Sequence, residues 1–311
     1  MVEKPKVSVL IPTYNGEDTV LSTIDSILSQ GFEDFEILIC DDGSTDGTRG
    51  RLVERRDPRI RIMHNEKNRG LSPTLNRLIR EASGQYIAFL DQDDLFLPNK
   101  LSRCVEVLDR SNCAGVSHDM KYLTHDGTLK GHLGAEVIFP SGFMGRAELV
   151  KETGGYREDL VVADSDFFCR FRALGPIRFI HEPLTAYRLV ANSASDMNWF
   201  DKRLVEQWYE EYPDTPMPFG TTGHREWFQE KPLSKRIALY LSWYGQRCGR
   251  RAAAYVFADR YLLAMWYSFL SVLLNPSYLI GRAWKMLLRR SRTAHSMLAI
   301  ISAAAVTCDI A

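Results

Sequence analysis

Residues 35–48 read FEILICDDGSTDGT, and this stretch decides the fold. Its first six residues are mostly apolar, and a polar, glycine-containing turn follows, which is typical of a buried strand with a sharp end. Asp41 and Asp42 close the apolar run. Because an unpaired buried charge is costly, these carboxylates need hydrogen bonds, a bound ligand or solvent. Ligands bind at the carboxyl ends of strands in open α/β sheets, so the stretch predicts a strand that ends at a ligand site.

The same pattern recurs through the first 110 residues. Apolar, β-branched runs predict strands, and apolar residues at helical spacing predict the helices between them. The expected strands are 7–11, 35–40, 60–63 and 86–90, and the expected helices are 20–28, 51–56, 73–82 and 98–110. We expect the first strand to stop at Pro12. Alternation at this rhythm is typical of parallel βαβ units, and therefore of an α/β domain.

Beyond residue 114 the rhythm changes. Short strand-like pieces at 115–117 and 137–139 surround 124–134, which reads as a turn or mobile loop. A helix is expected at 167–174 and an extended segment at 178–188. Prolines and glycines between 213 and 223 mark the clearest linker, and the chain beyond it looks helical to about residue 290.

Charge and cysteine content exclude some classes of protein. The 39 basic and 39 acidic residues give a formal net charge of zero, so the total does not suggest a nucleic-acid partner. The charge is unevenly spread, because 247–292 holds nine Lys/Arg and one Asp, a net +8. Six cysteines show no CxxC pair or metal-ligand spacing, and the N-terminus has no signal-peptide pattern. These features predict reduced cysteines and a cytoplasmic protein.

A second acidic cluster follows the expected strand 86–90. Residues 91–94 read DQDD, so two of the three carboxylates lie two residues apart and can reach one cation together from a tight turn. Oxygen ligands of this kind suit a hard divalent ion such as Mg²⁺ or Mn²⁺. The alternative is a solvated acidic loop at the start of the helix opened by Pro98, where Asp is also favourable. These residues alone favour neither the metal site nor the solvated loop over the other.

Four motifs occur in order and narrow the function. They are SVLIPTYNGEDTV (8–20), FEILICDDGSTDGT (35–48), GQYIAFLDQDDLFLPNKL (84–101) and VVADSDFFCRF (161–171). Together they resemble the family 2 glycosyltransferases, which are inverting enzymes of the GT-A fold that use nucleotide sugars. The resemblance runs from about residue 7 to about residue 195. It implies a Rossmann-like, mostly parallel central sheet flanked by helices, here with a C-terminal helical annex.

The resemblance implies a nucleotide site at the first two motifs. Pro12, Thr13 and Tyr14 would flank the base, with Tyr14 stacking on it for about 1–3 kcal/mol. Asp41 would accept a hydrogen bond from the imide N–H of the base, which favours uracil or thymine and thus a UDP- or dTDP-type donor. Asp42 is expected to point the other way and to brace the turn that follows it.

The third motif would then hold the diphosphate. By the resemblance, Asp93 binds a divalent metal, Mg²⁺ or Mn²⁺, and Asp91 contacts the metal through water or contacts the ribose. Asp94 would contact the sugar or support the ligands. The metal acts as a Lewis acid for the leaving diphosphate. Arg188 resembles a phosphate contact of the family's C-terminal loop, and its alternative is a surface ion pair.

The fourth motif carries the candidate general base. An inverting transfer needs a base to accept the proton of the attacking hydroxyl. Asp164 matches the family's catalytic position, and Asp166 is the second candidate. The family often has Glu before the base, where this chain has Ala163. The alternative role for Asp164 is to cap a helix that starts at Ser165.

Two further departures from the family bear on the reaction. Many members carry Arg before the Asn of GLSPTLNRLI, but here Leu75 precedes Asn76, which leaves Arg69 or Arg77 to approach the diphosphate. No QxxRW motif follows the candidate base, whereas processive polysaccharide synthases of the family carry one. We therefore expect transfer of a single sugar.

The expected organisation has three parts. A GT-A catalytic domain spans 1–212, with a nucleotide-binding half at about 1–95 and an acceptor half at about 96–212. A linker follows at 213–233, and a basic, apolar helical tail at 234–311. The expected activity is transfer of one hexosyl or related sugar to a hydroxyl of a glycan or lipid-linked acceptor. The alternatives are an inactive nucleotide-sugar-binding module of the same fold, a sugar-phosphate nucleotidyltransferase, and a membrane-anchored synthase subunit.

The tail raises the question of a membrane. Residues 261–281 carry no charge and are long enough to span a bilayer, but Asn275 and Pro276 interrupt them. Two helices broken at this pair explain the stretch better than a span does. With the positive charge of 247–292, they could lie on an anionic membrane face on the cytoplasmic side. The alternative is packing on the catalytic domain as a soluble annex, and 293–311 suggests no role.

Overall fold

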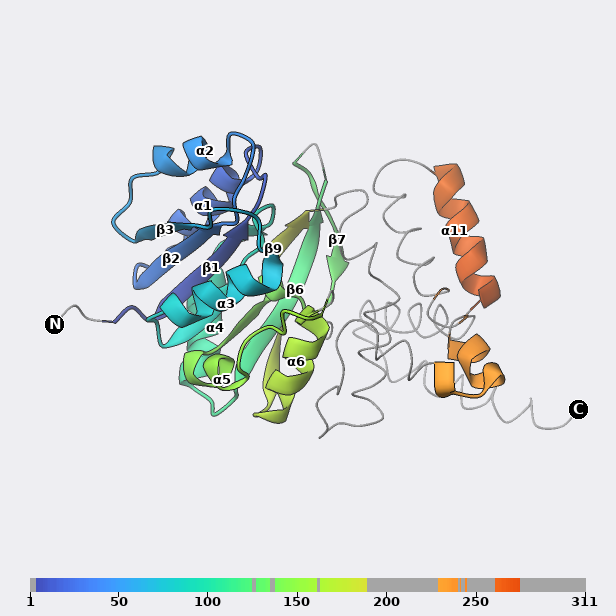
Figure 1. The fold of residues 1–311 in the computed structure, drawn as a ribbon. Coiled ribbons are helices and arrows are strands. Elements are labelled where there is room, and N and C mark those ends of the chain that lie inside the picture. Colours follow the sequence, from blue (N-terminus) through green and yellow to red (C-terminus); the bar gives the residue numbers. More distant parts are fainter. Residues whose placement is uncertain are drawn as a thin grey trace, which may run out of the picture. The chain divides into compact units, whose positions relative to one another are not determined.

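The computed structural model describes residues 4–124, 127–134, 138–160, 163–188, 229–239, 241, 244 and 261–274. The chain divides into two compact units, Met1–Glu230 and Lys231–Ala311 (Figure 1). Most of the expected linker, residues 213–228, lies outside the described residues.

The first half of unit one alternates strands and helices as predicted. Its strands are β1 (Val7–Thr13), β2 (Phe35–Asp41), β3 (Ile60–His64) and β4 (Tyr86–Phe89), and its helices are α1 (Val20–Leu28), α2 (Thr48–Glu54), α3 (Leu71–Glu81) and α4 (Lys100–Asp109). The four strands are parallel and lie in the order β3-β2-β1-β4. This order places the first strand in the middle, so the loops after β1, β2 and β4 meet at one edge.

The second half extends the same sheet with mixed pairing. Its elements are β5 (Leu95–Phe96), β6 (Gly115–Leu123), β7 (Leu129–Leu133), the 3₁₀ turn η1 (Pro140–Gly142), β8 (Phe143–Arg146), α5 (Ala147–Glu152), α6 (Ala163–Ala173) and β9 (Ile177–Arg188). Strand β8 runs antiparallel to β4 and β6, and β6 pairs with β9 in parallel. The full order is β3-β2-β1-β4-β8-β6-β9-β5, with β7 beside β6.

The first strand continues through Pro12, contrary to the prediction. Strand β1 runs to Thr13, and Pro12 pairs with Cys40 of β2. The carbonyl of Leu10 accepts from Leu90 on the β4 side, and Pro12, two residues on, faces that side too. Because β4 has ended at Phe89, no bond is lost where proline lacks its N–H.

The predicted loop at 124–134 is wrong as well, because this stretch contains a strand. Strand β7 pairs antiparallel with β6 through Leu123 and Leu129, and the Thr124 N–H donates to the Thr128 carbonyl at 3.0 Å to close the turn. The segment LKGHL has little β-propensity, so its pairing with β6 rather than its composition makes it a strand. The strand expected at 137–139 does not form at the two of its residues that the structure describes.

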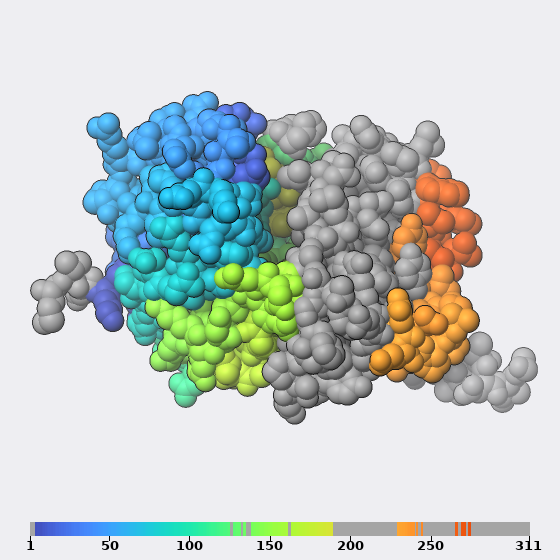
Figure 2. Space-filling model, viewed as in Figure 1, coloured from blue at the N-terminus to red at the C-terminus, as the bar shows by residue number. Residues whose placement is uncertain are grey.

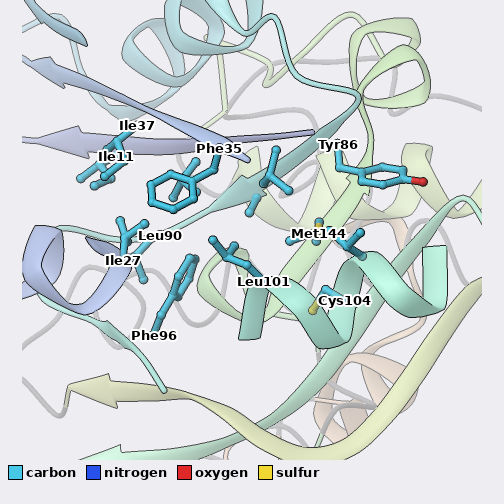
Figure 3. Close-up of a cluster of buried hydrophobic side chains, with 14 of the residues drawn as sticks. Ile11, Ile27, Phe35, Ile37, Tyr86, Leu90, Phe96, Leu101, Cys104 and Met144 are labelled. Atoms are coloured by element: carbon cyan, nitrogen blue, oxygen red, sulfur yellow. The ribbon is translucent and has the colours of Figure 1, made fainter. Parts of the chain in front are cut away.

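Two apolar layers cover the two faces of the sheet. On one face, alternate residues of the central strands meet α1 and α4, and Figure 3 shows Ile27, Leu101 and Cys104 reaching this layer from the helices. On the other face, α3, α5 and α6 pack over Leu10, Leu38 and the end of β4 (Figure 1). Near-continuous apolar strands buried on both faces are the expected signature of a parallel sheet covered by helices.

An aromatic cluster fixes α6 on the second face. Phe89, at the end of β4, meets Tyr156 and Phe167 edge-on, with ring centroids 5.9 and 5.8 Å apart. Tyr156 stacks on Phe167 at 4.3 Å with the ring planes 3° apart. Such pairs contribute about 0.5–1.5 kcal/mol beyond their buried area. The start of α6 is therefore held against the end of β4.

Unit two is described in two helical pieces. Residues 233–239 are helical, and α11 spans Tyr261–Leu274. No described helix combines the length and the apolar character needed to cross a bilayer.

Candidate active site

The candidate site lies at the carboxyl edge of β1, β2 and β4. The loop after β1 carries Tyr14, β2 ends at Asp41, and the acidic loop (residues 91–94) follows β4. All three come from parallel neighbours in the sheet, so the topology brings these sequence-predicted residues to one edge.

Gln92 joins two of these loops, and its role was not predicted. Its Oε1 accepts from Thr13 Oγ1 at 2.5 Å and from the Tyr14 N–H at 2.8 Å, and its Nε2 donates to the Tyr14 carbonyl at 3.1 Å. A Cβ on Gly16 would lie 2.4 Å from Gln92 Oε1, so a larger residue there would displace this amide. This amide therefore ties the expected base-binding loop to the expected metal-binding loop.

Tyr14 remains available on this tied loop. Its side chain is 40% exposed, while Pro12 and Thr13 are buried. Asn15 adopts a positive φ of 50°, and its side-chain oxygen accepts from the Thr45 N–H at 2.9 Å. The loop is thus held from both sides, and the aromatic ring is left at the surface.

Asp41 is wholly buried at the end of β2 and is hydrogen-bonded. Its Oδ1 accepts from the Ser44 N–H at 3.0 Å, and its Oδ2 lies 3.3 Å from both Arg49 Nε and His64 Nδ1. Burial alone would raise the pKa of this carboxyl, but the hydrogen bonds from Ser44, His64 and Arg49 outweigh it and hold the pKa below its usual range. Asp41 is therefore an anion at neutral pH.

Asp42 does not brace the turn after β2, contrary to the prediction. Asp41 makes that contact, through the Ser44 N–H. The carboxylate of Asp42 instead accepts from Asn65 Nδ2 at 2.7 Å, from the Arg69 N–H at 3.0 Å and from the Gly70 N–H at 2.8 Å. The two N–H groups lie at the start of α3, where an anion is favourable, so Asp42 anchors that helix to β2.

The acidic loop concentrates negative charge. Burial first, and then the charges of Asp93 and Asp164, raise the pKa of Asp91 to about 7. The pKa of Asp93 is raised by burial too, although the nearby Arg188 opposes this. Asp164 of the fourth motif is thus near enough to Asp91 of the third for its charge to raise the pKa of Asp91.

Asp94 is the last residue of this loop, and only one of its two carboxyl oxygens is hydrogen-bonded among the described residues. Its Oδ1 accepts from the Arg188 N–H at 2.8 Å, and its Oδ2 is buried with no hydrogen-bond partner among the described residues. Burial and the charges of Asp91 and Asp93 raise its pKa well above the usual value. Arg188 also donates from Nε to the Asp93 carbonyl at 2.8 Å, so the end of β9 is tied to the acidic loop.

These residues fit a cation. Three neighbouring carboxyls with raised pKa values mean that the site is short of positive charge. Within the described part of the chain, no three His, Cys, Asp or Glu side chains gather into a complete ligand set. A Mg²⁺-type ion on a diphosphate requires only one or two protein carboxylates, because phosphate and water oxygens complete its shell.

Lys100 supplies a buried cation under the loop and was not predicted either. Its Nζ donates to the Ser141 carbonyl at 3.1 Å and lies 4.0 Å from the centre of the Phe96 ring. Ser141 Oγ in turn accepts from the Asp91 N–H at 3.0 Å. Burial lowers the pKa of Lys100 to about 8, and the charge of Asp94 opposes that shift.

The two candidate bases occupy different surroundings. Helix α6 begins at Ala163, four residues before the helix expected at 167–174, so both lie in its first turn. Asp166 is wholly buried and accepts from Arg170 Nε at 2.8 Å and from its terminal nitrogen at 2.6 Å. Arg170 also donates to the carbonyls of Thr153 and Gly155. Asp166 is thus part of a structural ion pair, whereas Asp164 is partly exposed.

Tyr156 adds a hydroxyl to the site. Its OH is buried and has no hydrogen-bond partner among the described residues. Burial raises its pKa well above the usual value, and the charges of Asp164 and Asp91 add to this. Asn76 holds its backbone, accepting from the Tyr156 N–H at 2.7 Å and donating to its carbonyl at 2.8 Å. Asn76 thus has a structural role in this chain.

Arg69 and Arg77, the two cations expected to approach the diphosphate, differ in how their side chains are placed. Arg77 donates to the His64 carbonyl at 2.8 Å and to Asn65 Oδ1 at 2.7 Å, so its guanidinium is engaged beside β3. Arg69 is exposed on the loop that leads into α3. Arg69 is therefore the better placed of the two to meet a ligand.

The sequence comparisons decide the family. The model of glycosyl transferase family 2 matches residues 8–156. TuaG of Bacillus subtilis (strain 168), whose name assigns it to teichuronic acid biosynthesis as a glycosyltransferase, is 32% identical over 225 residues, which are 66% of this chain and 87% of TuaG. The chain belongs to glycosyl transferase family 2. This family 2 glycosyltransferase is an enzyme. Membership of this family excludes the alternative of a sugar-phosphate nucleotidyltransferase.

Other relatives match a shorter stretch. The Escherichia coli enzyme WfgD, named as a UDP-Glc:alpha-D-GlcNAc-diphosphoundecaprenol beta-1,3-glucosyltransferase, is 40% identical over 106 residues. That alignment covers 34% of this chain and 42% of WfgD. The similarity to WfgD therefore concerns about a third of this glycosyltransferase.

Solved structures confirm the predicted fold class. Staphylococcus aureus TarS 1–349 in complex with UDP aligns over 89% of this chain and 92% of TarS, with a TM-score of 0.55 and 18% identity. The mannosyltransferase PcManGT of Pyrobaculum calidifontis, solved with GDP-Man and Mn²⁺, aligns over 93% of this chain and 89% of its own, with a TM-score of 0.57 and 20% identity. The glycosyltransferase is thus an α/β protein of the GT-A type.

Proposed function

We propose that this glycosyltransferase moves one sugar, with inversion, from a UDP- or dTDP-sugar to a hydroxyl of a lipid-linked or cell-surface glycan precursor. Asp164 is the general base in this proposal. The observation that supports it is the contact between Phe89 and Phe167, with ring centroids 5.8 Å apart, because it holds α6, whose first turn carries the partly exposed Asp164, against the end of β4. Asp166 is the weaker candidate, since Arg170 neutralises it.

The donor site is assigned to the first two loops. Tyr14, exposed on a loop held by Gln92, would stack on the base, and Pro12 and Thr13 would shape the wall beside it. Asp41 is an anion that could accept from an imide N–H once Arg49 or His64 moves aside. A uracil or thymine base has that N–H. The UDP complex of the structurally similar TarS agrees with this choice, whereas the GDP-Man complex of PcManGT favours guanine.

The metal site is assigned to Asp93, with Asp91 in support and Asp94 toward the sugar. A Mg²⁺ or Mn²⁺ ion bound there would act as a Lewis acid on the leaving diphosphate. The raised pKa values of the three carboxyls support this assignment, because a bound cation relieves their crowding. Arg188, tied to the same loop, would face the phosphates.

The acceptor hydroxyl would approach from the side of α6. Asp164 takes its proton as the oxygen attacks the anomeric carbon, and the nucleotide leaves on the opposite face. The aromatic contact between Phe167 and Phe89 holds α6 against β4 and so keeps the base at a fixed distance from the acidic loop. The diphosphoundecaprenol acceptor in the name of WfgD supports a lipid-linked acceptor, and hence a cytoplasmic enzyme working at the membrane face.

The first experiment is a thermal shift on the full chain with UDP, dTDP and GDP, each with and without Mn²⁺. We expect UDP or dTDP to stabilise the protein only with metal, and Asp93→Ala to abolish the shift. Asp164→Asn should keep the shift and lose hydrolysis and transfer of the donor sugar. A nucleotide shift without hydrolysis or transfer by the wild type would favour the inactive-module alternative. No shift with any nucleotide would overturn the proposed donor site, and a shift with GDP alone would overturn the role given to Asp41.

A further inference from the structure

Helix α11 exposes apolar side chains and buries a polar one, which is the reverse of the pattern in a helix that faces water. None of its 14 residues is charged. Met265, Trp266, Phe269 and Leu273 are 69, 57, 58 and 65% exposed, yet Ser271 is wholly buried. At about 100° per residue, the four exposed side chains fall within an arc of about 100°, and Ser271 lies on the opposite side. The helix therefore presents an apolar stripe, which we call the α11 stripe (Met265, Trp266, Phe269 and Leu273).

The other described helix of unit two repeats this arrangement. Leu233, Ile237 and Leu241 are exposed at a spacing of four residues, which places them on one face. In all, seven of the twelve exposed large apolar side chains among the described residues belong to unit two. The exposed red and orange segments are visible in Figure 2. Clustered exposed apolar groups of this kind mark an interaction surface.

The charge of the chain is divided at the boundary between the two units. Residues 231–311 hold twelve Lys/Arg and two Asp, a net +10, so residues 1–230 carry −10. One of these bases, Arg260, directly precedes α11. Each Lys/Arg near an anionic bilayer contributes about 1 kcal/mol of attraction. A positive charge of this size also disfavours a second copy as the occupant, because two such units repel each other.

The distribution of tryptophan points the same way. All six tryptophans of the chain lie at or beyond residue 199, and Trp266 stacks with Phe269 at 6.2 Å on the exposed stripe. Tryptophan is enriched at the level of the lipid headgroups. The 14 described residues of α11 are about 21 Å long, shorter than the hydrocarbon core of about 30 Å, and this length suits the headgroup interface.

We propose that unit two docks on an anionic phospholipid bilayer, with the α11 stripe inserted at the headgroup boundary and the basic residues against the lipid phosphates. This deepens the proposed function, because it names the surface on which a lipid-linked acceptor would be met. Unit two supplies the membrane contact, because it carries the net positive charge and unit one carries the negative charge.

The test is flotation of the full chain with vesicles of phosphatidylcholine alone or of phosphatidylcholine with an equal amount of phosphatidylglycerol. We expect binding to the anionic vesicles only, weakened by salt. The double variant Trp266→Ser with Phe269→Ser should bind at least tenfold more weakly. The control Val53→Ser with Phe179→Ser removes two exposed apolar side chains from unit one and should bind like the wild type.

A second measurement locates the stripe in the bilayer. Brominated lipid should quench part of the tryptophan fluorescence, and Trp266→Phe should lose that part while still binding. Binding unchanged in the serine double variant, or no binding by the wild type, would overturn the proposal. Concentration-dependent dimers that the double variant abolishes, without vesicle binding, would assign the stripe to a second copy and overturn it too.

These outcomes are separable from the proposed reaction. The thermal shift with UDP and Mn²⁺, and hydrolysis of the donor sugar in solution, should be the same in the serine double variant and the wild type. Loss of vesicle binding with these retained supports the docking surface. A wild type that binds vesicles but shows no nucleotide shift would retain the docking surface and refute the proposed function.

Discussion

Replacing Asp91 with Asn should stabilise the unliganded protein, and the gain should depend on pH. The pKa of Asp91 rises from 3.8 to about 7 in the folded protein, because of burial and then of Asp93 and Asp164. The folded state therefore binds this proton more tightly than the unfolded state does. Asp91 therefore lowers the free energy of unfolding of the wild type least below pH 4. Its destabilising effect grows as the pH rises toward 7.

The size of the effect follows from that shift. At 1.36 kcal/mol per pKa unit, the penalty above pH 7 is at most about 4 kcal/mol, and it falls below about 1 kcal/mol at pH 4. Asp91→Asn should remove it, so the variant should exceed the wild type at pH 8 and nearly match it at pH 4. The comparison is made in EDTA without nucleotide, so that no cation relieves the crowding.

Urea unfolding followed by far-UV circular dichroism is the suitable assay. Tryptophan fluorescence would miss most of unit one, because residues 1–198 contain no tryptophan. Asp46→Asn is a control of opposite sign: burial would raise the pKa of Asp46, but its hydrogen bonds to Thr48 dominate and lower it. That variant should lose stability above the unfolded pKa, most clearly at pH 8.

The decisive outcome is the difference between the two pH values. If Asp91→Asn is less stable than the wild type at pH 8, or if its gain is the same at pH 4 and pH 8, the crowding of carboxylates is not the cause. Adding UDP and Mn²⁺ should favour the wild type, because the variant has lost part of its charge for the cation.

Three other variants have expected outcomes in the same unfolding assay. Asp166→Asn should lower the free energy of unfolding by about 3 kcal/mol, because it leaves the partly buried Arg170 without its anion. Asp164→Asn should change it little, and equal losses would contradict the distinction between the two residues. Gln92→Ala should lower the free energy of unfolding by about 2 kcal/mol, because three hydrogen bonds are lost. One such bond contributes at least about 0.5 kcal/mol, so a smaller loss would show that the two loops hold together without Gln92. Tyr156→Phe should raise the free energy of unfolding by about 1 kcal/mol by removing an unpaired hydroxyl, and a fall would reveal a partner for it.

The sequence predicted the parallel half of the sheet because its strands are apolar throughout. The run at 35–40 became β2 with one residue added, and 60–63 became β3 in the same way. Such strands are buried on both faces, so composition alone marks them. Strand β7 could not be found in this way, because its five residues become a strand only by pairing with β6. The prediction that the first strand ends at Pro12 was wrong for a related reason. Whether a proline ends a strand depends on whether the neighbouring strand would bond to the N–H that proline lacks.

The sequence predicted which residues lie at the candidate site where residue type and position at a strand end are enough to indicate it. Acidic residues at strand ends mark such positions, and those of the second and third motifs do meet at one edge of the sheet. Gln92 and Lys100 were missed because their partners are distant in sequence: 78 residues separate Gln92 from Tyr14, and 41 separate Lys100 from Ser141. The one available signal was a polar residue between two carboxylates of the acidic loop.

The aromatic contacts of Phe89 couple the two halves of the proposed reaction. Phe89 lies two residues before Asp91, and its ring contacts Phe167, three residues after Asp164. Packing of the core thus sets the spacing between the proposed base and the diphosphate loop, while Tyr14 of the base-binding loop is exposed and lies outside that packing. Evolution could exchange donor or acceptor specificity by altering loops and leave the reaction distance intact. A core substitution such as Phe89→Leu would have the opposite effect, lowering turnover for every donor alike.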